Sequence, residues 1–315
     1  MTALVNVIVT LGMLYVVPAG LRLIDPVHLL RTARLWPLAA APGALCLWLP
    51  RGMPATALAA LYAAACLALA ARAPIRLLRA RSLTPPAIAV ATALVSPSIA
   101  ATALVSERAG YRLFGFDLDI LALTVPHFHF AGFTAALVAG LVCRAVDGRA
   151  GTGGLARWAA CSVPAGTLLV LLGYFVDDWA ELLGAVVLTG GMWAVALLTW
   201  REIRPAGPDR TTRTLLATSA AVLVATMLLA LWWAAGEATG ITHPTLTWMA
   251  ATHGLGNALG FALCSVLAWR RLTAEARTAE TRTAQVRTAD RPDRRPGDRP
   301  APRPRTTSDR VEISP

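Results

Sequence analysis

The side chains best suited to chemistry in this sequence are three histidines inside long apolar segments. His127 and His129 follow Pro126 in one such segment, and His253 lies in another, four residues before Asn257. Imidazole binds transition metals and exchanges protons near neutral pH. Ionisable groups are costly inside a bilayer and are kept mostly where they have a function. We therefore take His127, His129, His253 and Asn257 as the candidate site.

The overall composition is that of a membrane protein. Of the 315 residues, 56% are hydrophobic and 15% are charged, whereas about 25% are charged in soluble domains. The net charge is +11. A basic excess in such a chain marks cytoplasmic loops and contact with anionic lipid rather than nucleic acid. We expect a multi-pass protein of the cell membrane whose main partner is the lipid bilayer, and the sequence identifies no protein partner.

The apolar segments predict an all-α fold, a bundle of nine transmembrane helices. A helix needs about 20 apolar residues to cross the hydrocarbon core. The candidate spans cover residues 3–22, 36–50, 54–71, 84–105, 118–143, 158–176, 182–200, 214–235 and 245–269. The second span is short and is bounded by Pro37 and Pro50, so a bundle of eight spans is the alternative.

Loop charges predict the orientation of the bundle. The loops that follow odd-numbered spans are rich in arginine, and those that follow even-numbered spans contain more acidic residues. The positive-inside rule then places the N-terminus outside and the C-terminus in the cytoplasm. We expect residues 1–270 to form the transmembrane domain. Residues 271–315 are rich in Arg and Pro and have no apolar face, which predicts a disordered cytoplasmic tail.

The histidines of the fifth and ninth spans are predicted to lie at one depth. His127 comes about ten residues after Asp117, and His253 about nine after Pro244, which puts both roughly 13–15 Å below the outer surface. The two spans run in the same direction, so we predict that His253 and one histidine of span five line one cavity. Since residues two apart on a helix point about 200° from each other, the other histidine should face a neighbouring helix.

Acidic residues near the outer ends of the spans are further candidates. The Asp119 carboxylate could accept a hydrogen bond from a histidine ring and so fix its orientation. Asp177, Asp178 and Glu181 match the Asp-Asp-x-x-Glu pattern that binds magnesium diphosphate in isoprenoid cyclases. This pattern is short and falls on a predicted outer loop, whereas isoprenoid diphosphates are made in the cytoplasm. We therefore interpret it as an acidic, solvated loop.

Two stretches of the chain resemble the signature stretches of YndJ-like membrane proteins. Residues 126–133 read Pro-His-Phe-His-Phe-Ala-Gly-Phe, and residues 253–261 read His-Gly-Leu-Gly-Asn-Ala-Leu-Gly-Phe. The resemblance covers spans five and nine and supports the choice of site residues. The family is often labelled a transporter, which the resemblance would imply for this chain.

Two functions fit these residues. The first is a membrane-embedded enzyme with a buried His/carboxylate site, acting on a small or lipophilic substrate in a biosynthetic pathway. His127, His129 and His253 would bind one transition metal for redox chemistry, or act as acid–base groups in a rearrangement or cyclisation. Asn257 would orient a histidine or the substrate. The alternative is a proton-coupled transporter or exporter that uses the same residues as a proton relay. A third reading is an assembly partner without chemistry of its own.

Overall fold

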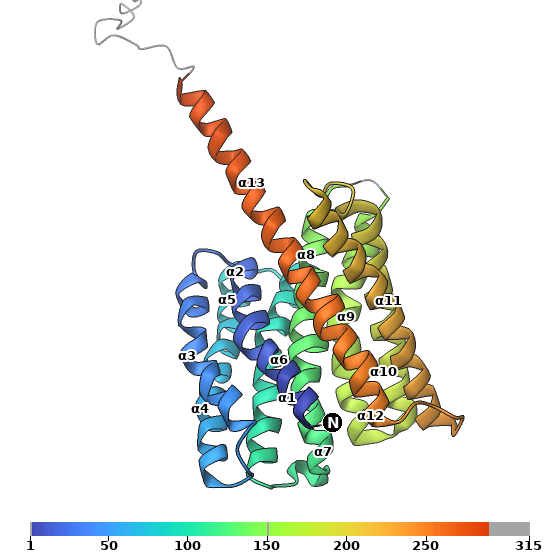
Figure 1. Cartoon of the computed structure of the whole chain (residues 1–315). Coiled ribbons are helices and arrows are strands. Elements are labelled where there is room, and N and C mark those ends of the chain that lie inside the picture. Colours follow the sequence, from blue (N-terminus) through green and yellow to red (C-terminus); the bar gives the residue numbers. More distant parts are fainter. Residues whose placement is uncertain (1, 150, 290–315) are drawn as a thin grey trace, which may run out of the picture. The chain divides into compact units, whose positions relative to one another are not determined.

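The computed structural model describes residues 2–149 and 151–289, and these form nine helical segments, as predicted (Figure 1). Three of the nine are interrupted by π-helical turns within the span. The first five segments are α1–η1–α2 (Thr2–Leu11, Gly12–Val16, Val17–Ile24), α3 (Leu30–Cys46), α4–α5 (Met53–Ala70, Arg72–Ala80), α6 (Pro85–Arg108) and α7–η3–α8 (Leu118–His127, Phe128–Thr134, Ala135–Ala145). A short 3-10 turn, η2 (Leu113–Gly115), precedes α7.

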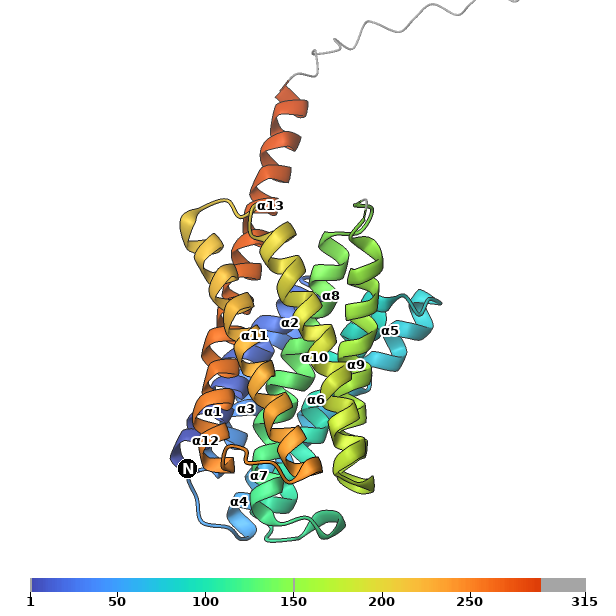
Figure 2. The same cartoon turned by 90° about the vertical axis from the view of Figure 1, so that its right-hand side faces the viewer.

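The last four segments complete the bundle. They are α9 (Gly153–Val176), α10–η4 (Asp178–Leu198, Thr199–Ile203), α11 (Arg210–Thr239) and α12–η5–η6–α13 (Leu246–Met249, Ala250–Gly254, Gly256–Leu263, Cys264–Ala289). Helices α9, α10 and α11 lie side by side (Figure 2). The chain divides into two compact units, residues 1–273 and 274–315.

Eight of the nine segments in the described residues are long and apolar enough to cross a membrane. The remaining one is α3, which has 17 residues and contains Pro37 and Pro42. Its length of about 25 Å falls slightly short of a hydrocarbon core of about 30 Å. Helix α3 nevertheless runs antiparallel to α1: Asn6 near the start of α1 donates a hydrogen bond to the carbonyl of Leu47 just after α3 (2.8 Å).

The segment expected to be disordered from residue 271 on begins as a helix. Helix α13 continues to Ala289. Residues 274–289 include several Ala, Arg and Glu residues, which favour helix, so a helix begun in the last span can continue through them. The rest of the predicted tail, residues 290–315, lies outside the described residues.

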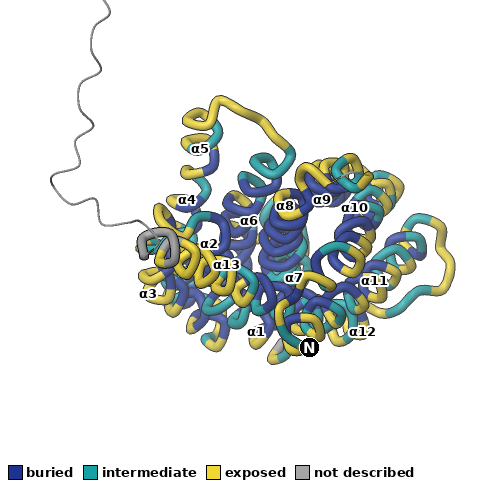
Figure 3. Tube along the Cα trace, turned by 90° about the horizontal axis from the view of Figure 1, so that it is seen from above, coloured by how far each residue is buried: buried dark blue, intermediate teal, exposed yellow. Residues whose placement is uncertain are grey.

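The fifth segment lies at the centre of the first unit. A larger share of its most apolar part is buried (83%) than in any other candidate span. All residues of α8 from Ala135 to Cys143 are buried (Figure 3). Peripheral helices instead expose large apolar side chains such as Leu61, Leu168 and Leu228, as expected of surfaces that face lipid. Span five, which carries two of the candidate histidines, is therefore held on all sides by other helices.

Three π-helical segments, η1, η3 and η6, contact one another. Within η3 the hydroxyl of Thr134 donates to the carbonyl of His129, five residues earlier (3.0 Å). Pro126 cannot donate the backbone hydrogen bond of a regular helix, which helps to explain why the helix widens just after it. The first stretch noted in the sequence, residues 126–133, covers the end of α7 and most of η3, and the second, residues 253–261, covers the end of η5 and most of η6. Such widened turns are frequent at functional sites.

The predicted orientation can be tested with reporter fusions. A reporter fused after Ala276 should lie in the cytoplasm, and one inserted between Val176 and Asp178 should lie outside, because arginine-rich loops stay on the cytoplasmic side. Alkaline phosphatase activity and green fluorescence report the two sides. Reporters that respond from one and the same side would contradict the predicted topology.

Candidate functional site

A cavity of about 220 Å³ opens between the fifth span and the last four helices of the bundle. Its walls come from α7 and the start of η3, the end of α9, the start of α10, the end of α11, and the segments α12, η5 and the start of η6. All of these lie toward one end of the bundle, the end at which α1 begins. The loop charges predict that this end is outside. Most of the wall is apolar, and its ionisable side chains are His127, Tyr174, Glu181 and His253.

His127 and His253 both line this cavity, as the sequence predicted for one histidine of each span. The His127 ring packs edge-on against Phe128, with the ring centroids 5.6 Å apart. Its Nε2 atom is buried and has no hydrogen-bond partner among the described residues. A buried polar atom without a partner costs free energy. A small rotation of the His127 ring would bring this unpartnered nitrogen to a molecule in the cavity that the residue lines.

A closed ring of hydrogen bonds holds His253 in place. Its Nδ1 donates to the carbonyl of Thr226 (2.8 Å), and its Nε2 accepts from the Asn257 amide (3.0 Å). The Thr226 hydroxyl donates in turn to the Asn257 carbonyl oxygen (2.8 Å). Because a backbone carbonyl can only accept, the proton of a neutral ring sits on Nδ1. Both ring nitrogens are therefore occupied, and Asn257 orients the histidine as expected.

Two glycines after His253 allow segment η6 to approach α11 closely. A Cβ atom on Gly256 would lie 2.8 Å from a methyl group of Thr226, and one on Gly260 would lie 2.6 Å from Val222. These small residues let the two helices approach closely, as their four-residue spacing predicted.

His129 lies elsewhere and does not join the other two histidines. Its side chain is fully buried, with Nδ1 donating to the carbonyl of Val125 (2.7 Å) and Nε2 accepting from the hydroxyl of Tyr62 (2.6 Å). Its ring stacks on that of Tyr62 and packs against Gly12. The two-residue spacing explains this, because His129 points away from the face that bears His127. His129 thus links spans one, three and five, through Gly12 of η1 and Tyr62 of α4.

The three-histidine metal site suggested by the sequence is not assembled. No group of three or more His, Cys, Asp or Glu side chains in the described part of the chain is placed to hold a metal ion. His129 is bound to Tyr62, and neither ring nitrogen of His253 is free for a ligand bond.

Asp119 does not reach the histidine cavity either. It lies on a second cavity of about 70 Å³, near Asn6 and the ion pairs of Glu107. Its position eight residues before His127 places it about two turns away and rotated off that face. The predicted supporting role of Asp119 toward a histidine is therefore not realised in this structure.

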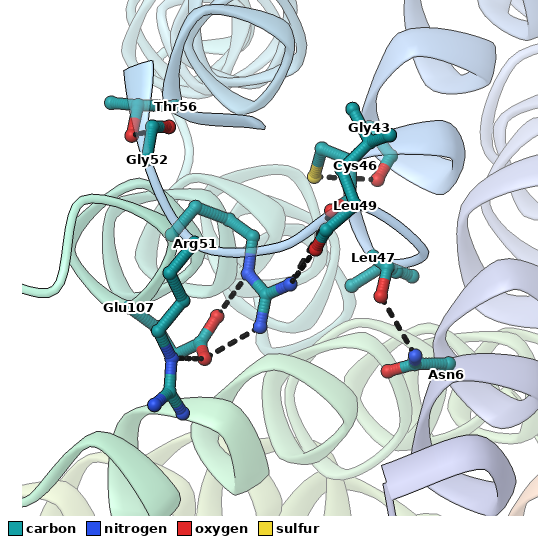
Figure 4. Close-up of polar contacts among 10 residues, drawn as sticks. Asn6, Gly43, Cys46, Leu47, Leu49, Arg51, Gly52, Thr56 and Glu107 are labelled. Carbon is teal, nitrogen blue, oxygen red and sulfur yellow. Dashed lines mark hydrogen bonds and ion pairs between the residues drawn. The ribbon is translucent and has the colours of Figure 1, made fainter. Parts of the chain in front are cut away.

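Beside that second cavity, two arginines surround a buried carboxylate. Glu107 is 2% exposed and pairs with Arg51 (Nε to Oε1, 2.8 Å) and with Arg108 (Nη2 to Oε1, 2.6 Å) (Figure 4). Arg108 also donates to the carbonyls of Cys46 and Leu49, where α3 ends. A cation there satisfies carbonyls that lack a partner within the helix. This cluster joins the ends of α3 and α6.

Glu181 also lines the cavity, although the sequence predicts that it lies in a solvated loop. Helix α10 begins at Asp178, and the Asp177 carboxylate caps it by accepting from the Ala180 amide (2.7 Å). Glu181 thus lies within the first turn, 9% exposed and on the cavity wall, rather than in a solvated loop. An aspartate before an apolar run is a helix N-cap signal, which would have moved the predicted start of this span to residue 178.

The fold and this cavity define a polytopic helical membrane protein with two histidines and a carboxylate on the wall of one cavity. The YndJ-like protein family matches residues 7–261. The chain therefore belongs to the YndJ-like family, which confirms the resemblance seen in the two stretches. No curated protein and no solved structure matches the chain.

Proposed function

We propose that this protein is a membrane-embedded enzyme that performs acid–base chemistry on a small lipophilic substrate. One observation carries the proposal: His127, whose Nε2 has no hydrogen-bond partner in the described part of the chain, and Glu181 line one largely apolar cavity. Acid–base chemistry fits better than metal-dependent redox chemistry, because the three histidines point to different places. An apolar cavity among membrane spans suits a substrate that partitions from the bilayer.

The two groups would divide the proton transfers between them. One gives a proton to the substrate and the other removes a proton from it, so the product is an isomer and no co-reactant is needed. Positioned acid–base groups of this kind each contribute about 10²–10⁴-fold to rate. His253 would act as a rigid part of the wall, since Asn257 and Thr226 fix its ring.

Untargeted product analysis tests this function without a known substrate. The purified protein in detergent micelles is incubated with an extract of lipids and small molecules from the source cells, and the mixture is compared by chromatography and mass spectrometry. We expect a compound to be replaced by an isomer of equal mass. His127→Ala and Glu181→Gln should each slow this conversion about 10²-fold or more.

His28→Ala is the matched control, because His28 lies in a loop and pairs with Asp25 (3.1 Å) instead of lining the cavity. It should convert the substrate at the normal rate. If the wild type converts nothing, or the three variants behave alike, the proposed function is wrong.

A proton-coupled transporter is the second candidate, and the π-helical interruptions favour it. Segments η1, η3 and η6 interrupt three spans where these meet, and many transporters bind their cargo at interrupted helices. In micelles, which have no compartments, a transporter would leave every compound chemically unchanged. In sealed vesicles it would accumulate its cargo in response to a pH gradient.

A further inference from the structure

We propose that the cavity binds a small, mostly apolar molecule carrying one protonated amine, with the amine held by Glu181. This inference rests on the proposed function for its place in the molecule and adds the chemical class of the ligand. Three features of the cavity support it: its size, its charge and its aromatic side chains.

The cavity limits the ligand to about one ring with a short chain. Its volume is about 220 Å³, and an engineered apolar cavity of about 150 Å³ holds benzene. A larger lipid would have to leave most of its chain outside. The apolar part of the wall, with Leu171, Leu188 and Met227 among its residues, suits a hydrocarbon body of this size.

The charge of the wall favours a cation. Of the described residues that line the cavity, Glu181 is the one acid, and none is an arginine. No hydrogen bond or ion pair joins the Glu181 carboxylate to another side chain in the described part of the chain. A buried carboxylate without a partner is costly, and a bound ammonium group would remove that cost. An anionic ligand would add to it.

Aromatic rings near Glu181 provide the second feature of an amine site. Tyr174 at the end of α9 and Trp233 at the end of α11 line the cavity together with Glu181 at the start of α10. The faces of such rings attract cations. The Trp233 ring is held from outside by His243 (ring centroids 6.2 Å apart), which is itself paired with Glu237 (3.0 Å). A carboxylate that shares one cavity wall with two aromatic rings is suited to an ammonium group.

Three probes of similar size test the ligand class: 2-phenylethylamine, the neutral 2-phenylethanol and the anionic phenylacetate. Binding to the full chain in nanodiscs of zwitterionic lipid is measured by calorimetry, with empty nanodiscs subtracted for partition into lipid. The amine should bind roughly tenfold or more tightly than the alcohol, because a charge-assisted hydrogen bond replaces a neutral one. Phenylacetate should bind least.

Two variants on α10 locate the effect. Glu181→Gln keeps the shape of the side chain and should abolish the preference for the amine. Asp178→Asn removes an exposed carboxylate one turn earlier and should keep the preference. Trp233→Leu should weaken binding of the amine more than binding of the alcohol. This variant provides a second test if Glu181→Gln does not fold.

The inference is overturned if the amine and the alcohol bind equally well, or if the preference survives in Glu181→Gln. Amine binding without any chemical conversion would leave this inference standing and remove the proposed enzyme. If the protein converts a neutral compound but shows no preference for amines, the proposed enzyme stands and this inference fails.

Discussion

Replacing Glu107 with alanine should destabilise the bundle by about 3–5 kcal/mol, the usual cost of leaving one member of a buried ion pair without its partner. Arg108 is 8% exposed and has two of its contacts on the Glu107 carboxylate. Without them its charge would remain in the protein interior beside the end of α3. The free energy of unfolding, measured by titration with a denaturing detergent, checks this expectation.

Asp117→Ala provides the control for this change. Asp117 also pairs with an arginine, Arg112, near the same end of the bundle, but the two side chains are 72% and 62% exposed. An exposed pair contributes about 0–1 kcal/mol, so this variant should unfold nearly as the wild type does. Equal losses from the two variants would mean that the Glu107 cluster has no special part in stability.

Gly184→Ala should cost about 3 kcal/mol, the upper end of the usual range for overpacking. A Cβ atom at position 184 would lie 2.4 Å from the backbone nitrogen of Val170, and backbone cannot rotate away. Helices α9 and α10 would have to separate. Since Val170 and Glu181 line the cavity from these two helices, binding of 2-phenylethylamine should fall as well.

Gly190→Ala is the control for Gly184→Ala, because it adds a methyl group to the same helix without crowding the backbone of α9. At this position the nearest atom to an added Cβ is the far end of the Trp158 ring, at 3.0 Å, which can shift. We expect a loss below about 1 kcal/mol and unchanged binding. A Gly184→Ala protein as stable as Gly190→Ala would show that the two helices pack less tightly than described.

The number and approximate positions of the helices could be predicted from the sequence because they follow from local composition. Apolar length located all nine segments, including α3 with its two prolines. The divergence of His127 and His129 followed from their spacing. Which of the two faces the cavity depends on Tyr62, a residue of α4 that is 67 positions from His129, and no local pattern reveals such a neighbour.

The misplaced acidic residues show a second limit. Glu181 was assigned to a loop because its span was started four residues too late, and a boundary error of that size moves a side chain from solvent into a cavity. Asp119 lies in the predicted span, but about two turns from His127 and on a face that turns toward α1 and the Glu107 cluster. The rotation of a helix about its axis depends on packing between helices.

The central claim, a negatively charged cavity open to small molecules, is tested most directly by the reactivity of a cysteine placed at Ala185. Ala185 lines the cavity four residues after Glu181 and so shares its face of α10. Methanethiosulfonate reagents of equal size but opposite charge should modify Ala185→Cys at different rates, the cation faster. Ala194→Cys, buried on the same helix away from the cavity, should not react above the background from exposed Cys161. If Ala185→Cys is as unreactive as Ala194→Cys, or if the cation and anion react equally fast, the proposed site does not exist.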